Sequence, residues 1–305
     1  MNKFLLLAFS ILFSLPLSGQ INIQDSSVQV IGYWGKNEQQ TYAFSYVKYS
    51  VTGSDTTSKT VMTYEVDVTI KDSTAHSYTI EWFYKNYAIE TQDELVRKIA
   101  SMGKDVSVLI KTDEFGAILE VLNWEEVRDY ITNATEVIKK DIAGIPAAEA
   151  IMAQNLSTYS SKQGIESNAI KDAQQFYTFH GGKYVMGTNY TGQMQLANNY
   201  GGAPFDVDLT VNLDEINEED GNAIIRMYQN VNAEQLTNAT YDYLKKVGIL
   251  GNQLPTRDEF PPLTNEIWTA SRIHSASGWP IYSIETREVV SEGATAIEER
   301  IIEIK

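Results

Sequence analysis

The sequence predicts an α+β protein in which a large, curved, half-barrel-like antiparallel sheet carries helices on its concave face. Segments of alternating apolar and polar residues, separated by short turns rich in Gly, Ser and Asp, predict antiparallel strands. A block with helical periodicity in the middle of the chain separates two groups of such strands. One strand pattern occurs in both groups, so we expect the sheet to consist of two related halves.

The repeated strand pattern defines one buried face. Residues 64–70 read Tyr-Glu-Val-Asp-Val-Thr-Ile, and residues 205–211 read Phe-Asp-Val-Asp-Leu-Thr-Val. Side chains alternate between the two faces of a strand, so one face is apolar and the other is acidic. The aliphatic residues expected to be buried are Val66, Val68, Val207 and Leu209. Asp67 and Asp208 are expected to be exposed, so that replacing Asp67 with Asn costs little stability.

The first group of elements follows a short polar entry segment. Strands are expected over 41–52, 61–70 and 77–86, a helix over 91–103, and strands over 106–111 and 118–122. Thr91 and Glu94 have the spacing of a capping box, and Gly103 is a suitable helix end. Gly116 suits the turn between the last two strands.

The central block is expected to contain three helical segments. Apolar residues recur at helical spacing over 125–142, Pro146 can open the next helix, and a third segment covers 165–179. Gly181 and Gly182 end the block.

The second group repeats the order of the first. Strands are expected over 183–196, 205–213 and 223–230, a helix over 233–247, and strands over 267–275, 280–290 and 296–304. This order predicts an internal duplication, and the alternative is a chance likeness between two ordinary meanders. One position disagrees, because Trp82 falls opposite Arg226 when the halves are aligned. The predicted divisions are a signal peptide (1–20), a first β-rich half (21–124), a helical insert (125–181) and a second β-rich half (182–305).

The first residues resemble an export signal. Lys3 precedes an apolar run over 4–17, which is short for a membrane span, and small residues follow at Ser18 and Gly19. We expect cleavage there and a periplasmic or secreted protein, with an N-terminal membrane anchor as the alternative. The rest of the chain has no comparable apolar run, so stable membrane insertion is not expected. There is no cysteine, which excludes disulfides, thiolate metal sites and an acylated lipoprotein anchor.

Charge and motifs exclude several classes of function. The net charge of −16 opposes binding to nucleic acid or to anionic membranes. His76, His180 and His274 lack metal-ligand spacing and are expected at the surface. No phosphate-binding loop, dinucleotide motif or Gly-x-Ser-x-Gly nucleophile elbow is present. Four strand acids could form carboxylate pairs, but a solvated face is the better interpretation: Glu65, Asp67, Asp206 and Asp208. We therefore expect neither an enzyme nor a bound metal or cofactor.

The aromatic residues of the predicted strands suggest a ligand cavity. Tyr and Trp alternate along 41–52 and 77–86, and rigid aromatics can line an apolar pocket. We expect such a cavity between the sheet and the helices of 125–179. The candidate wall residues are Tyr64, Trp82, Tyr84, Phe205 and Tyr228. The alternative is that these side chains fill the core.

The order of elements behind an export signal resembles the bacterial lipoprotein-carrier-like half-barrel proteins, in which an incomplete barrel wraps helices and shelters acyl chains. The resemblance covers nearly the whole mature chain and rests on no diagnostic motif, so it transfers no functional residue. It implies a non-enzymatic envelope protein that binds a lipid or another hydrophobic small molecule. The alternative is an interaction or scaffold protein without a small-molecule site.

Overall fold

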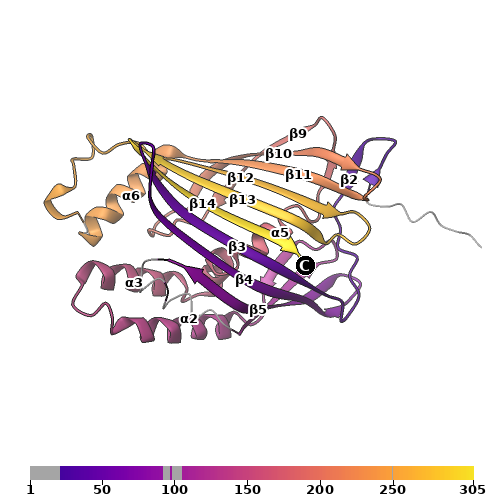
Figure 1. Ribbon diagram of the computed structural model, residues 1–305, viewed down its shortest axis with the longest axis horizontal. Helices are drawn as coiled ribbons and strands as arrows, with labels where there is room; N and C mark the ends of the chain where they lie inside the picture. Colours follow the sequence, from indigo (N-terminus) through magenta and orange to yellow (C-terminus); the bar gives the residue numbers. More distant parts are fainter. Residues whose placement is uncertain (1–20, 92–96, 98–104, 249) are drawn as a thin grey trace, which may run out of the picture.

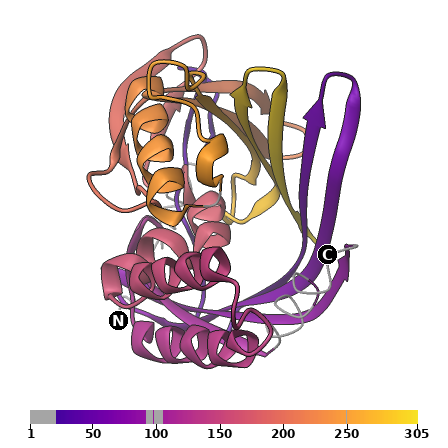
Figure 2. The ribbon, with the colours of Figure 1, turned by 90° about the vertical axis from the view of Figure 1, so that its left-hand side faces the viewer.

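The computed structural model describes residues 21–305, except 92–96, 98–104 and 249. Its main element is one antiparallel sheet of eleven strands, curved across its width (Figures 1 and 2). In pairing order the strands are β7 (Ile118–Val121), β6 (Val106–Asp113), β5 (Ser77–Glu90), β4 (Asp55–Ser73), β3 (Gln39–Thr52), β14 (Ala294–Ile304), β13 (Pro280–Ser291), β12 (Thr264–His274), β11 (Asn222–Val231), β10 (Phe205–Asn217) and β9 (Asn189–Leu196). The sheet is open, with β7 and β9 at its edges, and this confirms the predicted fold class.

The strand order is the same in both halves of the chain. Strands β3 to β7 form one meander and β9 to β13 form another, and β14 joins them by pairing with both β3 and β13. In each meander the repeated pattern lies on the second strand, β4 or β10. This order agrees with an internal duplication, while the superposition of the two halves remains a prediction.

The helices are α2 (Trp124–Lys139), α3 (Pro146–Thr158), α4 (Lys162–Asn168), α5 (Lys171–Tyr177) and α6 (Ala233–Val247), followed by the 3-10 turn η1 (Gly251–Gln253). They are grouped on the concave side of the sheet (Figure 2). The bounds predicted for α6 are correct, because local signals fix both ends. The Asn232 side chain accepts a hydrogen bond from the Gln235 amide at 3.0 Å, and Gly248 ends the helix in the left-handed conformation at φ 70°.

The helix predicted over 165–179 is divided in the structure. It breaks at Ile170, whose φ of −113° and ψ of 36° are not helical, so α4 and α5 are separate. The Gln174 side chain donates to the Glu166 carbonyl at 2.8 Å, and the Asn168 side chain donates to the Gly164 carbonyl at 3.1 Å. These bonds satisfy carbonyls near the break, so interrupting the helix costs less.

The strand predicted over 183–196 is divided too. Gly187, at φ 78°, turns the chain between β8 (Lys183–Val185) and β9. Strand β8 joins a separate three-stranded sheet with β1 (Ile21–Asn22) and β2 (Ser27–Gln29). The predicted signal peptide lies outside the described residues, as does nearly all of the helix predicted over 91–103.

The largest core lies between the first meander and α5. Trp82 of β5 is fully buried and contacts Phe176 and Tyr177 of α5, with ring centroids 5.1 Å and 5.9 Å apart. The predicted alternation is confirmed at Val66, Val68 and Val207, all of which are buried, whereas Leu209 is only half-buried. We call the side of the sheet that carries these residues the inner face.

Candidate functional site

The structure brings together three of the five residues predicted to line a cavity. Tyr64 and Trp82 each have their ring about 6 Å from that of Tyr84, at 5.9 Å and 6.4 Å between centroids. The space in front of them is occupied by α5. The indole of Trp82 donates to the Tyr177 hydroxyl at 3.3 Å, and the Tyr64 hydroxyl donates to Asp172 at 2.6 Å. Between β3–β5 and α5, the aromatic residues therefore form core.

The other two candidates lie elsewhere. Phe205 is buried in a separate cluster, which consists of Phe205, Val207, Val231, Leu236 and Leu263. Tyr228 pairs with Thr210 on the face opposite to Leu209, so its side chain is on the outer face of the sheet. There its ring lies 5.8 Å from that of Trp268. Residues 84–86 (Tyr-Lys-Asn) and 228–230 (Tyr-Gln-Asn) are alike in sequence, but the hairpins of the two halves differ in register, and Tyr84 pairs with Val66 on the inner face.

Of three pockets in the described residues, two lie beside α6 and one includes the predicted wall residue Tyr64. The largest, about 580 Å³, is between the loop 198–204 and α6, and its lining side chains are exposed or half-buried. Another, of about 260 Å³, includes residues of β3, β4 and β14. The third, of about 300 Å³, lies between α6 and the proline-containing loop that follows it. Each of the three is lined by both apolar and charged residues.

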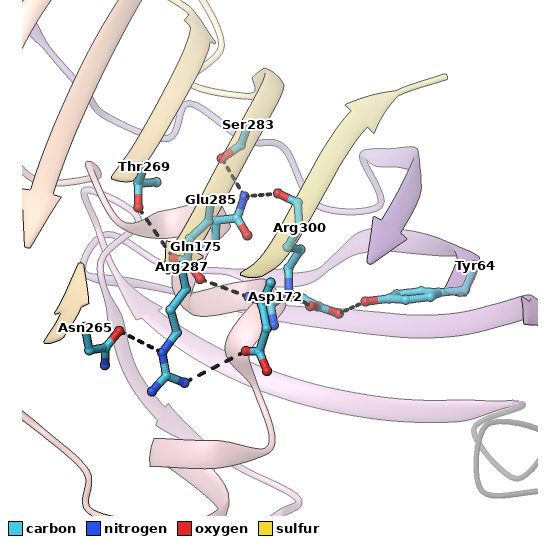
Figure 3. A network of polar contacts seen from close by, with 10 residues as sticks. Tyr64, Asp172, Gln175, Asn265, Thr269, Ser283, Glu285, Arg287 and Arg300 are labelled. Carbon is cyan, nitrogen blue, oxygen red and sulfur yellow. Dashed lines mark hydrogen bonds and ion pairs between the residues drawn. The ribbon is translucent and has the colours of Figure 1, made fainter. Parts of the chain in front are cut away.

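A charged network on the inner face brings acidic and basic side chains into contact (Figure 3). At its centre Arg300 of β14 contacts Asp172 of α5 at 2.9 Å and Glu285 of β13 at 3.1 Å. The Arg300 and Asp172 side chains are only 15% and 13% exposed. Tyr64 donates to the same aspartate, so this carboxylate is held by one cation and one hydroxyl. The contacts tie α5 to the second meander by charge-assisted hydrogen bonds.

The network continues toward solvent. Arg287 of β13 donates from Nε to Asn265 at 3.0 Å and lies 3.9 Å from Glu298 of β14, which also contacts Lys48 at 3.0 Å. Register explains the arrangement, because cross-strand partners share a face. Arg300 is opposite Glu285 and Tyr46, and Glu298 is opposite Arg287 and Lys48. We name this set the inner charged network: Lys48, Asp172, Glu285, Arg287, Glu298 and Arg300.

A buried amide anchors the network to α5. The Gln175 side chain donates to the Ser283 hydroxyl at 3.0 Å and to the Arg300 carbonyl at 3.2 Å, and Ser283 accepts from Ser271 at 2.8 Å. These bonds join α5, β12, β13 and β14. The position of α5 is therefore fixed by polar bonds on one side and by aromatic packing on the other.

Burial and charge set the protonation of the network. Burial by itself would lower the pKa of Arg300, but Asp172 and Glu285 outweigh it and raise that pKa. Burial opposes ionisation of Glu298, yet Lys48 and Arg287 hold its pKa below the usual value. Burial, followed by the nearby Asp172 charge, raises the pKa of Tyr64 well above its ordinary value. At neutral pH the tyrosine is therefore a neutral hydrogen-bond donor to an ion pair.

This network was not predicted from the sequence, because the prediction rested on the apolar residues of the strands. A period-2 signal was present on three consecutive strands, where polar residues occupy inner positions. These residues are Thr269 and Ser271 of β12, Ser283, Glu285 and Arg287 of β13, and Glu298 and Arg300 of β14. In a strand, polar residues on the covered face require partners. The sequence could not indicate that α5 supplies some of them.

The predicted acidic face is only partly solvated. Asp206 and Asp208 are exposed and accept hydrogen bonds from glutamines. Asp67 is half-buried, bonds to Lys85 at 2.5 Å and accepts from Thr41 at 2.7 Å, so the expectation that it is exposed is wrong. Burial would raise the pKa of Asp67, but these two partners outweigh it and lower the pKa. Replacing Asp67 with Asn should accordingly cost stability rather than be neutral.

The histidines also differ from the expectation of three surface side chains. His76 is exposed, and His274 is half-buried with Nδ1 2.8 Å from the Ser277 hydroxyl in a hairpin turn. His180 is 7% exposed and packs against the rings of Trp34 and Tyr177. Its Nε2 is 2.9 Å from the Gly278 carbonyl, which requires a proton on that nitrogen. Burial lowers the pKa of His180 to about 4, so the folded protein holds a neutral ring.

We expect the free energy of unfolding to decrease as the pH falls, because His180 is buried in its neutral form. Its pKa is about 6.5 in an unfolded chain and about 4 in the fold, so the unfolded state binds more protons between these values. Its contribution is complete above pH 6.5 and is lost as pH falls to 4, by about 3 kcal/mol. Urea unfolding of His180→Gln should show that much less loss between pH 7 and pH 4. His76→Gln is the control and should behave like the wild type; equal slopes in all three proteins would contradict the assignment.

Among the described residues, no group of three or more His, Cys, Asp or Glu side chains is placed to hold a metal ion. In the same part of the chain, no helix has the length and apolar character needed to cross a membrane.

Comparisons with known proteins add no family. No protein-family model and no curated protein matches the chain. A solved structure with some similarity is the crystal structure of an acyl-CoA thioesterase II, TesB2, from Mycobacterium marinum. It is 8% identical over 88% of this chain and 82% of that chain, with a TM-score of 0.11. Similarity at this level establishes neither a shared fold nor a shared activity.

Proposed function

We propose that the protein is an exported, non-enzymatic binding protein that holds an amphipathic, lipid-like ligand on the inner face of its second meander. The periplasmic or secreted location remains part of the proposal and is motivated by the N-terminal sequence pattern. The aromatic residues between β3–β5 and α5 form a filled core, so the proposed ligand site is not the cavity that was predicted from the sequence. The inner face of β9–β14 is the remaining concave surface with both apolar and charged side chains.

The observation that carries the proposal is an incompletely covered apolar surface on β9, β10 and β11. Leu209 and Val211 have the inner position of Val207, but they are half-buried rather than buried. Met227 is half-buried opposite Val211, and Met194, opposite Val207, is 38% exposed. Methionine adapts to ligands of different shape, because its side chain is unbranched and polarisable. A part-exposed apolar patch of this kind is typical of a binding surface.

The apolar surface and the charged network lie on the same face of the sheet, and the buried inner face of β12 separates them. Along one row across the sheet, Leu209 is opposite Gln229, Gln229 is opposite Ile267, and Ile267 is opposite Arg287. Residues that are directly opposite one another lie about 5 Å apart on the same face. The inner face of this half of the sheet therefore carries both apolar and charged side chains, which are the two kinds of surface that an amphipathic molecule contacts.

A non-enzymatic role is supported by how the charges are used. Asp172, Glu285 and Glu298 each contact a cation within the network. General acid–base catalysis needs a group that is free to exchange a proton with a substrate. Carboxylates held in ion pairs are better suited to positioning a ligand than to proton transfer.

An interaction role is the second candidate, and the outer face favours it. Trp268 is 39% exposed there and packs beside Tyr228. Exposed tryptophan and tyrosine are enriched at protein interfaces. Loss of a partner on Trp268→Ala, with ligand binding unaffected, would favour this alternative.

The test of ligand binding uses the neutral fluorescent probe N-phenyl-1-naphthylamine. We expect saturable binding to the wild type and at least tenfold weaker binding to Leu209→Asp, since a carboxylate would have to be desolvated against the probe. Leu119→Asp is the matched control, because Leu119 of β7 is 56% exposed and far from β10 in strand order. Absence of saturable binding, or equal weakening by both variants, would overturn the proposal.

A further inference from the structure

The pocket between α6 and the loop 198–204 is separate from the surface proposed above to bind an amphipathic ligand. Its volume of about 580 Å³ lies within the range of about 300–1,000 Å³ that is usual for small-molecule sites. In the described part of the chain, its lining includes none of the apolar residues of that surface, such as Leu209 and Met227. A ligand in this pocket would therefore be bound by a different set of side chains.

The loop that forms one wall is held in place by its own hydrogen bonds. The Asn198 side chain donates to the carbonyls of Gly201 at 3.0 Å and Ala203 at 3.2 Å, and it accepts from the Tyr200 amide at 3.0 Å. Gly201 and Gly202 have φ of 92° and 100°, which residues with a Cβ rarely adopt. This wall is formed before a ligand arrives, so binding needs little ordering of the chain.

Helix α6 forms the other wall and is tied to the end of the same loop. The Gln235 side chain donates to the Asp206 carboxylate at 2.7 Å and accepts from the Asp206 amide at 2.7 Å. Beside it, Leu236 is buried in one cluster with Phe205. Because residues 205 and 206 directly follow the loop, these contacts fix the distance between the two walls.

Polar side chains of α6 line the pocket with unused hydrogen-bonding groups. Asn238, Asp242 and Lys246 are four residues apart, so they lie on one side of the helix. Among the described residues, the Asp242 carboxylate and the Lys246 ammonium have neither a hydrogen bond nor an ion pair within 4 Å. Asn238 accepts from Arg257 Nε at 2.8 Å, but its own amide nitrogen has no acceptor in this part of the chain. The pocket therefore offers both donors and acceptors, and its two opposite charges cancel.

Two tyrosine rings provide an apolar surface beside these groups. Tyr200 of the loop and Tyr243 of α6 both line the pocket, with ring centroids 4.9 Å apart and planes at 33°. Both residues are half-buried, and neither hydroxyl has a partner within the described residues. A pyranose ring has the matching chemistry, since its C–H groups pack on aromatic rings while its hydroxyls donate and accept hydrogen bonds.

We propose that this pocket binds a neutral saccharide, whose ring packs on Tyr200 and Tyr243 and whose hydroxyls bond to Asn238, Asp242 and Lys246. The inference goes beyond the proposed function, because it concerns a second site and another class of ligand. An acyl chain in the pocket would desolvate the three polar side chains without replacing their hydrogen bonds to water. A charged ligand would be repelled by either Asp242 or Lys246, whereas a hydroxyl group can bond to both.

The test begins with a glycan array that carries neutral hexose and N-acetylhexosamine oligosaccharides. Isothermal titration calorimetry then measures the strongest binder and its constituent monosaccharide. We expect saturable binding to the wild type and at least about tenfold weaker binding to Asp242→Leu and to Tyr243→Ala. Lys245→Leu is the matched control, because Lys245 is exposed on α6 beside Lys246 but does not line the pocket. A monosaccharide that binds as tightly as its oligosaccharide identifies a free sugar as the ligand, and a weaker one identifies a glycan chain.

The outcomes separate this inference from the proposed function. Binding to no neutral glycan, or equal affinities of Asp242→Leu, Lys245→Leu and the wild type, would overturn the saccharide site. Leu209→Asp should weaken N-phenyl-1-naphthylamine but leave the saccharide unaffected; an equal loss of saccharide binding would contradict a separate pocket. Circular dichroism shows whether each variant is folded. Asp242 is exposed, so Asp242→Leu decides the outcome should Tyr243→Ala be unstable.

Discussion

Replacing Trp82 with alanine is expected to lower the free energy of unfolding by about 3–5 kcal/mol. Trp82 of β5 is fully buried, with its ring 6.1 Å from that of Phe44 of β3 and 5.1 Å from that of Phe176 of α5. Removing it opens a void that rigid neighbours cannot fill, and it leaves the Tyr177 hydroxyl without the indole donor. Urea denaturation followed by circular dichroism measures the change.

Trp268→Ala is the matched control for this variant. Trp268 also lies in a strand of the sheet but is 39% exposed on the outer face, so its loss should cost much less. Comparable destabilisation in the two variants would contradict the identification of Trp82 as the centre of the core. A wild-type-like Trp82→Ala protein would contradict the packing of α5 against β5.

Replacing Arg300 with methionine is expected to cost about 3–5 kcal/mol, because it leaves the largely buried Asp172 carboxylate without its cation. Glu285 loses its contact in the same change. Methionine keeps much of the side-chain volume, so the loss reports charge more than packing. The measurement is again the free energy of unfolding at neutral pH.

Two further variants test the reason for that loss. Arg226→Met removes an exposed pair with Asp214, at 2.8 Å, and should cost at most about 1 kcal/mol. Adding Asp172→Asn to Arg300→Met should restore part of the stability, since it removes the uncompensated charge; coupling energies in such cycles reach about 3 kcal/mol. Equal costs for Arg300→Met and Arg226→Met, or no coupling with Asp172, would show that the buried Arg300–Asp172 pair stabilises the fold no more than the exposed pair does.

The strands and their inner faces could be predicted from the sequence because they depend on local alternation. In β4, every second residue from Tyr64 to Ile70 is buried, as the period-2 pattern predicts. The ends of α6 were predictable for a similar reason. Asn232 and Gly248 act through hydrogen bonds and backbone angles within a few residues of themselves.

The candidate site was predicted less well, because it depends on register between distant segments. Tyr84 and Tyr228 occur in similar local sequences, yet one faces the core and the other faces outward. A shift by one residue reverses the face of every side chain in a strand, and the length of the connecting hairpin sets that shift. For Leu209, the position on the inner face could be predicted from the alternation, but how far other elements bury its side chain could not.

The sequence by itself therefore determined where most of the strands and helices lie and which residues of β4 and β10 face inward, since these follow from patterns a few residues long. The tertiary structure alone decided what each inward residue meets. Phe176 and Tyr177 fill the space in front of Trp82, and Asp172 meets Arg300 across more than a hundred residues of chain. Such contacts depend on where α5 docks in the curved sheet. That position is set by the sum of many long-range packing and hydrogen-bond terms, and no single local pattern encodes it.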